Sequence, residues 1–253
     1  MKKFLLALQF LTTFPIKVKD VETEDLTGSV SFFPLVGVII GIILASANYF
    51  LLRVMPPFLL NAILLILWIL ITGALHLDGF ADTVDGFSAS TEKEKILKVM
   101  DDPATGAKGV VAIVMALLLK FAILLSIGGT LKIWALIFAP AISRYSMFVA
   151  AGVSNPARKE GLGKLYIRKM KWVEFIFPTL IILVLLIAVF YFPVVKPVAG
   201  FVSFVVALLA VYSFVRYCKN RIGGMTGDTL GALNEIIEIT VLLAIAIVDF
   251  TWR

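Results

Sequence analysis

Long apolar runs constrain this chain more than any other feature of its sequence. A helix needs roughly 17–25 apolar residues to cross a bilayer. Runs of that length can be read at about 32–52, 58–77, 109–127, 133–151, 175–192, 198–215 and 231–248. Backbone groups in lipid need internal partners, and the alternation of barrel strands is missing. The sequence therefore predicts an all-α, polytopic transmembrane bundle of about seven spans.

The composition supports the same fold class. The chain has 253 residues, of which 60% are hydrophobic and 16% charged, whereas soluble domains are about 45–50% apolar and about 25% charged. No internal repeat and no low-complexity linker divides the sequence, so residues 1–253 are predicted to form one domain. In the first span, the spacing of Gly37 and Gly41 is typical of close helix packing.

Positive charges concentrate on alternate connecting segments. Lys and Arg residues gather in the N-terminal region and in residues 78–108, 152–174 and 216–230. The opposite loops hold single cations at Arg53, Lys132 and Lys196, and Arg253 lies at the C-terminus. Because cytoplasmic loops carry the excess of Lys and Arg, we expect a cytoplasmic N-terminus and an external C-terminus. Topology thus accounts for the net charge of +6, and no nucleic-acid partner is expected.

The N-terminal segment is a separate case. Lys2 and Lys3 precede an apolar stretch from Phe4 to Phe14, as in a signal peptide, but no small-residue cleavage pattern follows. At about thirteen residues the stretch is too short to span a bilayer. We expect a short interfacial or re-entrant helix.

Three acids follow the second apolar run, between His76 and Gly86. If the helix of Phe58 to Leu77 continues, Asp78, Asp82 and Asp85 share one face. Carboxylates this close repel one another unless a cation lies between them. Oxygen ligands favour Mg²⁺, and a single His is not a zinc-type set. The alternative is a solvated helix end with ordinary acids, and a histidine that is merely hydrogen-bonded at the interface.

A second polar run precedes the third span. It contains Asp101, Asp102 and a Gly-Ala-Lys-Gly sequence around Lys108, which lacks the order of a P-loop. Glycine-rich backbone and a lysine at a helix N-terminus nevertheless suit a phosphate. A flexible loop with an N-terminal cap explains the segment equally well.

Two cations lie within predicted spans. Arg144 is in the middle of its span, where a charge is a functional hypothesis with an acid or a bound phosphate as its partner. Structural pairing with an acid of another helix is the alternative. Lys120 lies nearer the outer end of its span, where a lysine can snorkel, and we assign it no role.

A third polar run enters the last span. After Gly223 and Gly224 it supplies oxygen-rich side chains, namely Thr226, Asp228, Asn234 and Glu235, with Glu238 beyond. Acids inside an apolar span are costly without partners. Taken alone, the run is a helix cap with buried hydrogen bonds. Taken with the first acids, it predicts the second wall of one site.

These clusters favour an enzyme. Metal-assisted phosphotransfer needs cations to neutralise a diphosphate and a group to position the nucleophile. A cation-coupled or proton-coupled transporter would favour ionisable residues near the midplane and repeated halves. A structural or receptor protein gives no reason for three runs of acids and glycines.

The motifs also resemble a known family. The stretch Gly73 to Gly86 is similar to the signature of cobalamin synthase, adenosylcobinamide-GDP ribazoletransferase. The resemblance spans almost the whole chain. It includes Leu8 to Thr12, Phe33 to Gly37, Met100 to Gly109, Ser143 to Tyr145, and Gly224 to Asp228 with Gly231, Ala232 and Glu235.

The resemblance implies a reaction at the cytoplasmic face of the cell membrane. A ribose hydroxyl of α-ribazole, or of its 5′-phosphate, attacks the phosphorus joined to the cobinamide arm of adenosylcobinamide-GDP, and GMP leaves. The family requires Mg²⁺. Its expected partners are these small molecules and the lipid bilayer, with a homo-oligomer or an assembly with other nucleotide-loop enzymes left open. A CDP-alcohol phosphotransferase is the second reading, but its Asp-Gly-x2-Ala-Arg core is not matched, because Asp82 follows Ala81.

We assign roles on this basis. The metal ligands are predicted to be Asp78, Asp82 and Asp85, and either Asp82 or His76 orients or deprotonates the hydroxyl. Lys108 and Arg144 counter phosphate charge. The remaining substrate-binding or second-metal residues are predicted to be Asp101, Asp102, Thr226, Asp228, Asn234 and Glu235.

Overall fold

The computed structural model describes residues 1–168, 170–191 and 197–251. Within these ranges the chain is helical apart from its connections and an isolated β-bridge between Pro156 and Met225. The elements in chain order are α1 (Lys2–Leu11), α2 (Thr23–Ser29), η1 (Val30–Phe32), α3 (Phe33–Leu51), α4 (Pro57–Thr72), α5 (Leu75–Ala89), α6 (Lys93–Met100), α7 (Ala107–Ser126), α8 (Gly129–Val153), α9 (Leu162–Tyr166), α10 (Trp172–Phe190), α11 (Pro197–Ile222) and α12 (Gly227–Thr251).

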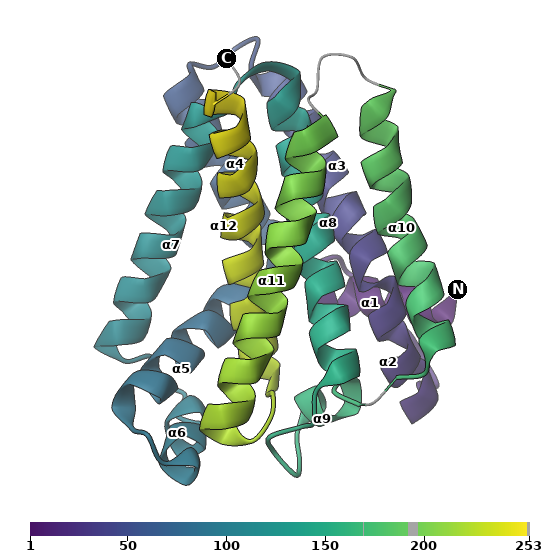
Figure 1. Cartoon of the computed structure of the whole chain (residues 1–253), viewed down its shortest axis with the longest axis vertical. Coiled ribbons are helices and arrows are strands. Elements are labelled where there is room, and N and C mark those ends of the chain that lie inside the picture. Colours follow the sequence, from purple (N-terminus) through teal and green to yellow (C-terminus); the bar gives the residue numbers. More distant parts are fainter. Residues whose placement is uncertain (169, 192–196, 252–253) are drawn as a thin grey trace.

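The predicted membrane bundle is confirmed. Six helical segments of the described chain are long and apolar enough to cross a membrane, and a bent pair, α4 with α5, raises the number to seven if it forms one span. The first span is longer than predicted, at Thr23–Leu51, because α2 and η1 lead directly into α3. The long helices run roughly parallel in Figure 1.

The connecting segments gather at two ends of the bundle as the charge pattern predicts. The loops after α3 and α7 lie at one end with the C-terminus, while α6, α9 and the turn before α12 lie at the other (Figure 1). Which end faces the cytoplasm stays a prediction from the positive-inside rule. Of the cations used in that argument, Lys169, Lys196 and Arg253 lie outside the described residues.

The second predicted span is interrupted, contrary to the expectation of a continuous helix from Phe58 to Leu77. Gly73 and Ala74 both adopt left-handed backbone angles, with φ of 61° and 57°. Their amide groups donate to the carbonyls of Leu70 and Ile69, which satisfies the end of α4. A helix cannot continue through two left-handed residues, so α5 leaves α4 at an angle of 88°.

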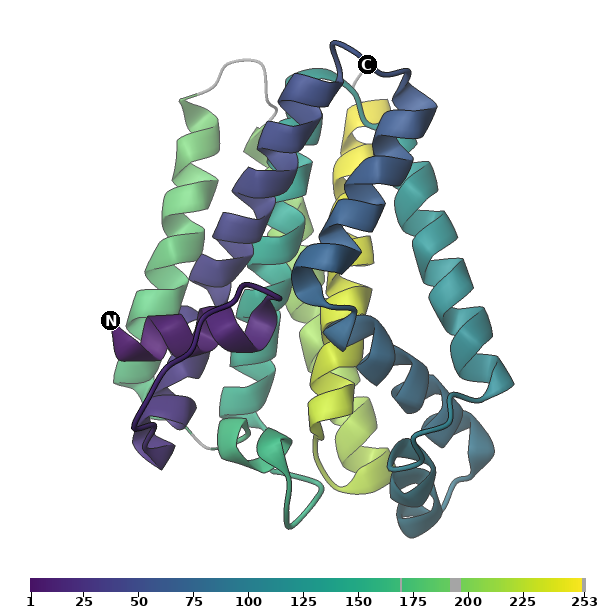
Figure 2. The same cartoon turned by 180° about the vertical axis from the view of Figure 1, so that it is seen from behind.

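The N-terminal helix is short, as predicted, and lies across the bundle. In Figure 2, α1 runs nearly at right angles to the long helices. The chain after α1 is hydrogen-bonded to the end of α4. The Thr13 amide donates to the Ile71 carbonyl at 2.8 Å, and the Thr13 hydroxyl donates to the Leu70 carbonyl at 2.9 Å. The N-terminal segment therefore supports the break that redirects α5.

The centre of the bundle is formed by α3, α8 and α12. Most of α8 is buried, and α3 packs along it. A Cβ at Gly37 would collide with the carbonyl of Pro140, and one at Gly41 would lie 2.6 Å from the Ile137 Cα. The close packing predicted from these two glycines is confirmed, and α8 is its partner.

We predict that Gly37→Ala lowers the free energy of unfolding by about 1–3 kcal/mol, because the added methyl group must push α3 away from α8. Thermal unfolding in detergent, followed by circular dichroism, measures this. Gly128→Ala is the matched control, since a Cβ there meets nothing within 4 Å. Equal melting temperatures for the two variants would contradict the prediction.

Candidate active site

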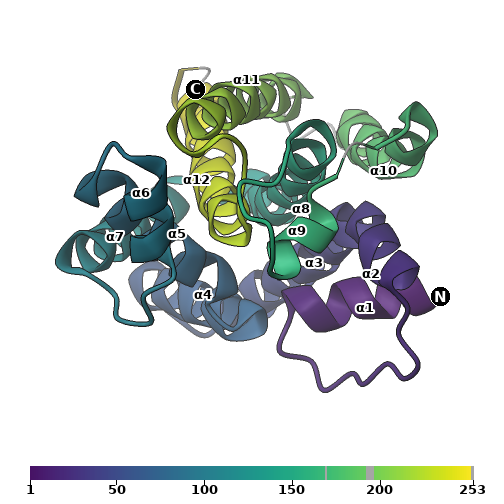
Figure 3. The ribbon, with the colours of Figure 1, turned by 90° about the horizontal axis from the view of Figure 1, so that it is seen from below.

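The first and third polar runs meet at one end of the bundle. Helix α5 carries all three acids of the first run, and it packs against the start of α12. The approach is close, because a Cβ at Gly79 would lie 2.9 Å from the Asp228 carbonyl and one at Gly231 would lie 3.3 Å from the His76 Cα. Seen from below in Figure 3, the start of α12 lies between α5 and α9. The structure therefore brings the two runs together.

A cavity of about 300 Å³ opens beside this contact. Four of the predicted site residues line it, namely His76, Asp78, Thr226 and Asp228. The same wall includes side chains for which the sequence suggested no catalytic or binding role: Arg158, Lys164 and Tyr166. The two cations belong to the basic segment 152–174, which served only to orient the bundle. Counting the Lys and Arg residues of each segment predicts topology, but it does not predict that Arg158 and Lys164 line the cavity.

Arg158 links the cavity to a second one. Its guanidinium lies 2.9 Å from Asp101 and 3.3 Å from Asp228. An open cavity of about 620 Å³ shares Arg158, Glu160 and Gly161 with the first and also contains Asp101. Asp101 therefore joins the site through Arg158, although it does not line the first cavity.

Tyr166 adds a neutral polar group to the cavity. It ends α9 and packs against Phe10 and Phe33, at ring distances of 4.9 and 5.8 Å. Burial raises the pKa of the Tyr166 phenol above its usual range. The lining of the cavity thus combines carboxylates, cations, an uncharged phenol and apolar side chains.

Negative charge accumulates along the α5 side of the site. Asp78 is exposed and lines the cavity, whereas Asp82, one turn further along α5, is half-buried and is not part of the lining. Asp82 experiences repulsion from Asp78, Asp228 and Asp85, opposed by Arg158. In the described part of the chain, no group of three or more His, Cys, Asp or Glu side chains is arranged to hold a metal ion. Any cation here would need ligands beyond the protein's own carboxylates.

Asp85 has a different environment from the other two acids. Its two carboxylate oxygens accept the amide groups of Gly106 at 2.7 Å and Gly109 at 2.9 Å, at the start of α7. Backbone amides of the predicted phosphate cradle are therefore used by an acid of the protein itself. Lys108 donates to the Ser88 carbonyl at 3.2 Å, and exposed Asp102 accepts the Ala104 amide at 2.9 Å. Neither Lys108 nor Asp102 lines either of the two cavities described above.

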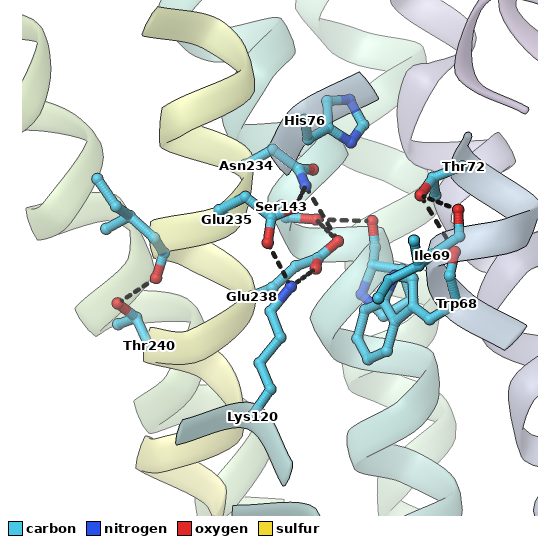
Figure 4. Close-up of polar contacts among 12 residues, drawn as sticks. Trp68, Ile69, Thr72, His76, Lys120, Ser143, Asn234, Glu235, Glu238 and Thr240 are labelled. Atoms are coloured by element: carbon cyan, nitrogen blue, oxygen red, sulfur yellow. Dashed lines mark hydrogen bonds and ion pairs between the residues drawn. The ribbon is translucent and has the colours of Figure 1, made fainter. Parts of the chain in front are cut away.

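A buried charge network lies deeper in the bundle (Figure 4). Lys120 of α7 pairs with Glu235 at 2.6 Å and with Glu238, both on α12. Arg144 of α8 pairs with Glu238, and the Asn234 amide donates to the same carboxylate at 3.1 Å. The expectation that Lys120 snorkels to the surface is wrong, because Lys120 is only 3% exposed. The nearby carboxylates offer a partner that sequence position alone could not reveal.

Arg144, Asn234 and Glu235 therefore lie away from the cavity lining, inside this network. Each was predicted to contact a substrate or a metal. The sequence allowed two roles for Arg144, binding a phosphate or pairing with an acid of another helix. The structure shows the ion pair, with Glu238 of α12. Glu238, which supplies that acid, is the residue on which the network's contacts converge.

His76 connects the network to the cavity. The Arg144 Nη2 atom lies 3.3 Å from its Nδ1 atom, and the residue lines the cavity. A guanidinium has only donors, so Nδ1 accepts and Nε2 carries the proton of a neutral imidazole. Nε2 has no hydrogen-bond partner among the described residues. His76 thus has one ring nitrogen held by the network and the other available as a donor.

Comparison of the sequence with known proteins gives one family and one protein name. A family model described as cobalamin-5-phosphate synthase matches residues 3–246. A protein named adenosylcobinamide-GDP ribazoletransferase from Thermoanaerobacter sp. (strain X514) is 38% identical over 96% of this chain and 96% of its own length. Proteins of the same name from Clostridioides difficile (strain 630) and Fusobacterium nucleatum subsp. nucleatum are 32% and 33% identical, covering 99% and 98% of both chains. No solved structure is significantly similar.

We predict that Asp85→Asn loosens the start of α7. An amide keeps one acceptor and turns a donor toward a backbone N–H, which costs about 1–3 kcal/mol for the unsatisfied group. Hydrogen–deuterium exchange of peptides covering residues 104–112 should become faster. Asp102→Asn is the control, because its single bond to Ala104 lies in an exposed turn. Unchanged exchange in Asp85→Asn would contradict an anchoring role.

Proposed function

The chain belongs to the cobalamin-5-phosphate synthase family, and from that membership we propose that it is an adenosylcobinamide-GDP ribazoletransferase of cobalamin biosynthesis. The observation that carries the proposal is the cavity in which Asp78 and Asp228 of two polar runs face Arg158 and Lys164. Carboxylates and cations in one cavity suit a metal-bound diphosphate, because the carboxylates take the metal and the cations take phosphate oxygens.

The proposed reaction is a displacement at phosphorus. The hydroxyl oxygen of α-ribazole, or of its 5′-phosphate, forms a bond to the phosphorus that carries the cobinamide arm. The bond from that phosphorus to the oxygen shared with GMP breaks, and GMP leaves with the electron pair. The hydroxyl proton passes to a base. The products are adenosylcobalamin, or its 5′-phosphate, and GMP.

The donor set of the site fits Mg²⁺. This ion is usually held by one or two carboxylates, with waters and substrate phosphates completing its shell. Asp78 and Asp228 in the cavity, with Asp82 one turn further along α5, would meet that requirement without a preformed set of three ligands. When bound, the ion would neutralise the diphosphate and the leaving group. Asp85, a predicted ligand, instead holds the start of α7 with both oxygens.

The surrounding residues then take separate roles. Arg158 and Lys164 hold phosphate oxygens, and Thr226 offers a hydroxyl beside Asp228, with its Oγ1 3.3 Å from the carboxylate. Asp82 is the proposed base, since its partial burial and, after it, the neighbouring negative charge favour taking up a proton. His76 is the weaker candidate for a base, because its Nε2 atom, the ring nitrogen that Arg144 does not contact, carries the proton, and we assign it to donate a hydrogen bond.

The positive-inside rule supports a site that faces the cytoplasm. The end of the bundle with α6, α9 and the start of α12 carries the three basic segments of residues 78–108, 152–174 and 216–230. Water-soluble nucleotide substrates reach that face directly. The protein is therefore proposed as a multi-pass enzyme of the cell membrane with its cavity open to the cytoplasm.

We predict that Asp82→Asn in the folded, purified protein lowers GMP release from adenosylcobinamide-GDP and α-ribazole by at least about a hundredfold, the usual contribution of a general base. A Mg²⁺ titration of the rate should show a weaker metal dependence, since charge beside the ion is removed. Glu92→Gln is the matched control, because this exposed acid pairs with Lys95 and lines neither cavity.

The same assay separates the proposal from its competitors. Near-normal turnover of Asp82→Asn with an unchanged Mg²⁺ dependence would remove Asp82 from the site. Release of CMP from CDP-alcohols, with no GMP from adenosylcobinamide-GDP, would indicate the other class of membrane phosphotransferase.

Arg158→Met is predicted to raise the KM for adenosylcobinamide-GDP by about 10–100-fold, the equivalent of one or two charge-assisted hydrogen bonds to phosphate. The kcat should change less. Arg216→Met is the control, since Arg216 is on α11 and donates to Tyr212 at 3.2 Å on the exposed surface. Equal KM values in the two variants would show that Arg158 serves only its ion pairs with Asp101 and Asp228.

A further inference from the structure

We propose that Lys120 of α7 is a positioning residue for His76 of α5, acting through Glu238 of α12 and Arg144 of α8. The proposal rests on the function proposed above only where turnover is measured, because the position of His76 can be observed directly. No motif of the sequence and no feature of the cavity includes Lys120.

Each link of the path is a contact between buried side chains. Lys120 lies at 2.5 Å from Glu238, whose second oxygen pairs with Arg144. The Nη2 atom of Arg144 lies 3.3 Å from the Nδ1 atom of His76. These four residues are 3%, 1%, 0% and 2% exposed, respectively. Solvent therefore does not screen the interactions, and a change in one group alters the attraction that acts on the next.

The charges of the network also balance. Lys120 and Arg144 supply two cations, while Glu235 and Glu238 supply two carboxylates. Removing Lys120 leaves one carboxylate without a cation in an apolar interior, where an unpaired charge is costly. Arg144 is then the only cation of the network left for both carboxylates, and its hydrogen bond to His76 competes with stronger attractions.

The path of contacts from Lys120 ends at His76, which lines the cavity. His76 is the only histidine of the chain. It lines the cavity, and its Nε2 atom has no partner among the described residues. A network that served only to join α7, α8 and α12 would not need an imidazole at its end. Holding Nδ1 as an acceptor fixes the proton on Nε2, from which it can be donated into the cavity.

The single histidine makes the proposal directly testable. Full-length protein labelled with ¹⁵N-histidine and placed in lipid nanodiscs gives one imidazole in the ¹⁵N spectrum. We expect one form in the wild type, with the proton on Nε2 and Nδ1 unprotonated. In Lys120→Met, a second form with the proton on Nδ1 should appear. Lys132→Met is the matched control, since Lys132 is also a buried lysine but bonds to Asn61, and it should give the wild-type spectrum.

A charge-balanced variant covers the case in which Lys120→Met does not fold. Lys120→Met combined with Glu235→Gln removes one cation and one carboxylate, so Arg144 and Glu238 remain a neutral pair. This variant should recover the wild-type His76 spectrum. A wild-type spectrum in Lys120→Met, or an altered spectrum that the balanced variant fails to restore, would overturn the proposal.

Kinetics test whether this positioning matters for turnover. Lys120→Met should lower the kcat for GMP release by about tenfold, the effect of losing one well-placed hydrogen bond. In a His76→Gln background the same substitution should have little further effect, because both changes remove one interaction. Fully additive losses would contradict the path through His76. Absence of GMP release from the wild type would refute the proposed function and leave the spectroscopic result intact.

Discussion

The pairing of buried charge is the constraint on which the rest of the structure depends. Lys120, Arg144, Glu235 and Glu238 lie inside an apolar bundle, where none is tolerable alone. Their mutual contacts fix the relative positions of α7, α8 and α12, since a shift of any of these helices along its axis would separate a cation from its carboxylate. Because Asp228 is the second residue of α12, fixing α12 also fixes one wall of the cavity.

The second determinant is the break between α4 and α5. A continuous helix from Phe58 would have carried the acids away along the bundle axis. The left-handed pair Gly73 and Ala74 instead turns α5 across the end of the bundle, against α12. For Ala74 this conformation costs about 1–2 kcal/mol, and the hydrogen bonds from Thr13 to the end of α4 help to maintain it.

Hydropathy was sufficient to predict the spans, because the requirement for internal hydrogen bonding in lipid leaves few alternatives to helices. It did not predict the break, since an alanine with a left-handed backbone has no sequence signature. For the site, the spacing of acids and glycines predicted that Asp78 and Asp228 belong together. The spacing could not reveal Arg158 or Lys164, because the basic segment that contains them served only as a topological signal. It also could not reveal the burial of Lys120, which depends on carboxylates more than 110 residues away in the sequence.

The three acids of α5 illustrate why a motif does not assign a common role to its members. They recur one turn apart on one helix, yet Asp78 lies in the cavity, Asp82 is half-buried beside other negative charges, and Asp85 caps the start of α7. Helical spacing places side chains on one face but does not determine what lies opposite each of them. Because α5 runs from the cavity toward α7, successive turns meet different neighbours. The same carboxylate group therefore faces an open cavity at one end of the helix and anchors the backbone of α7 at the other.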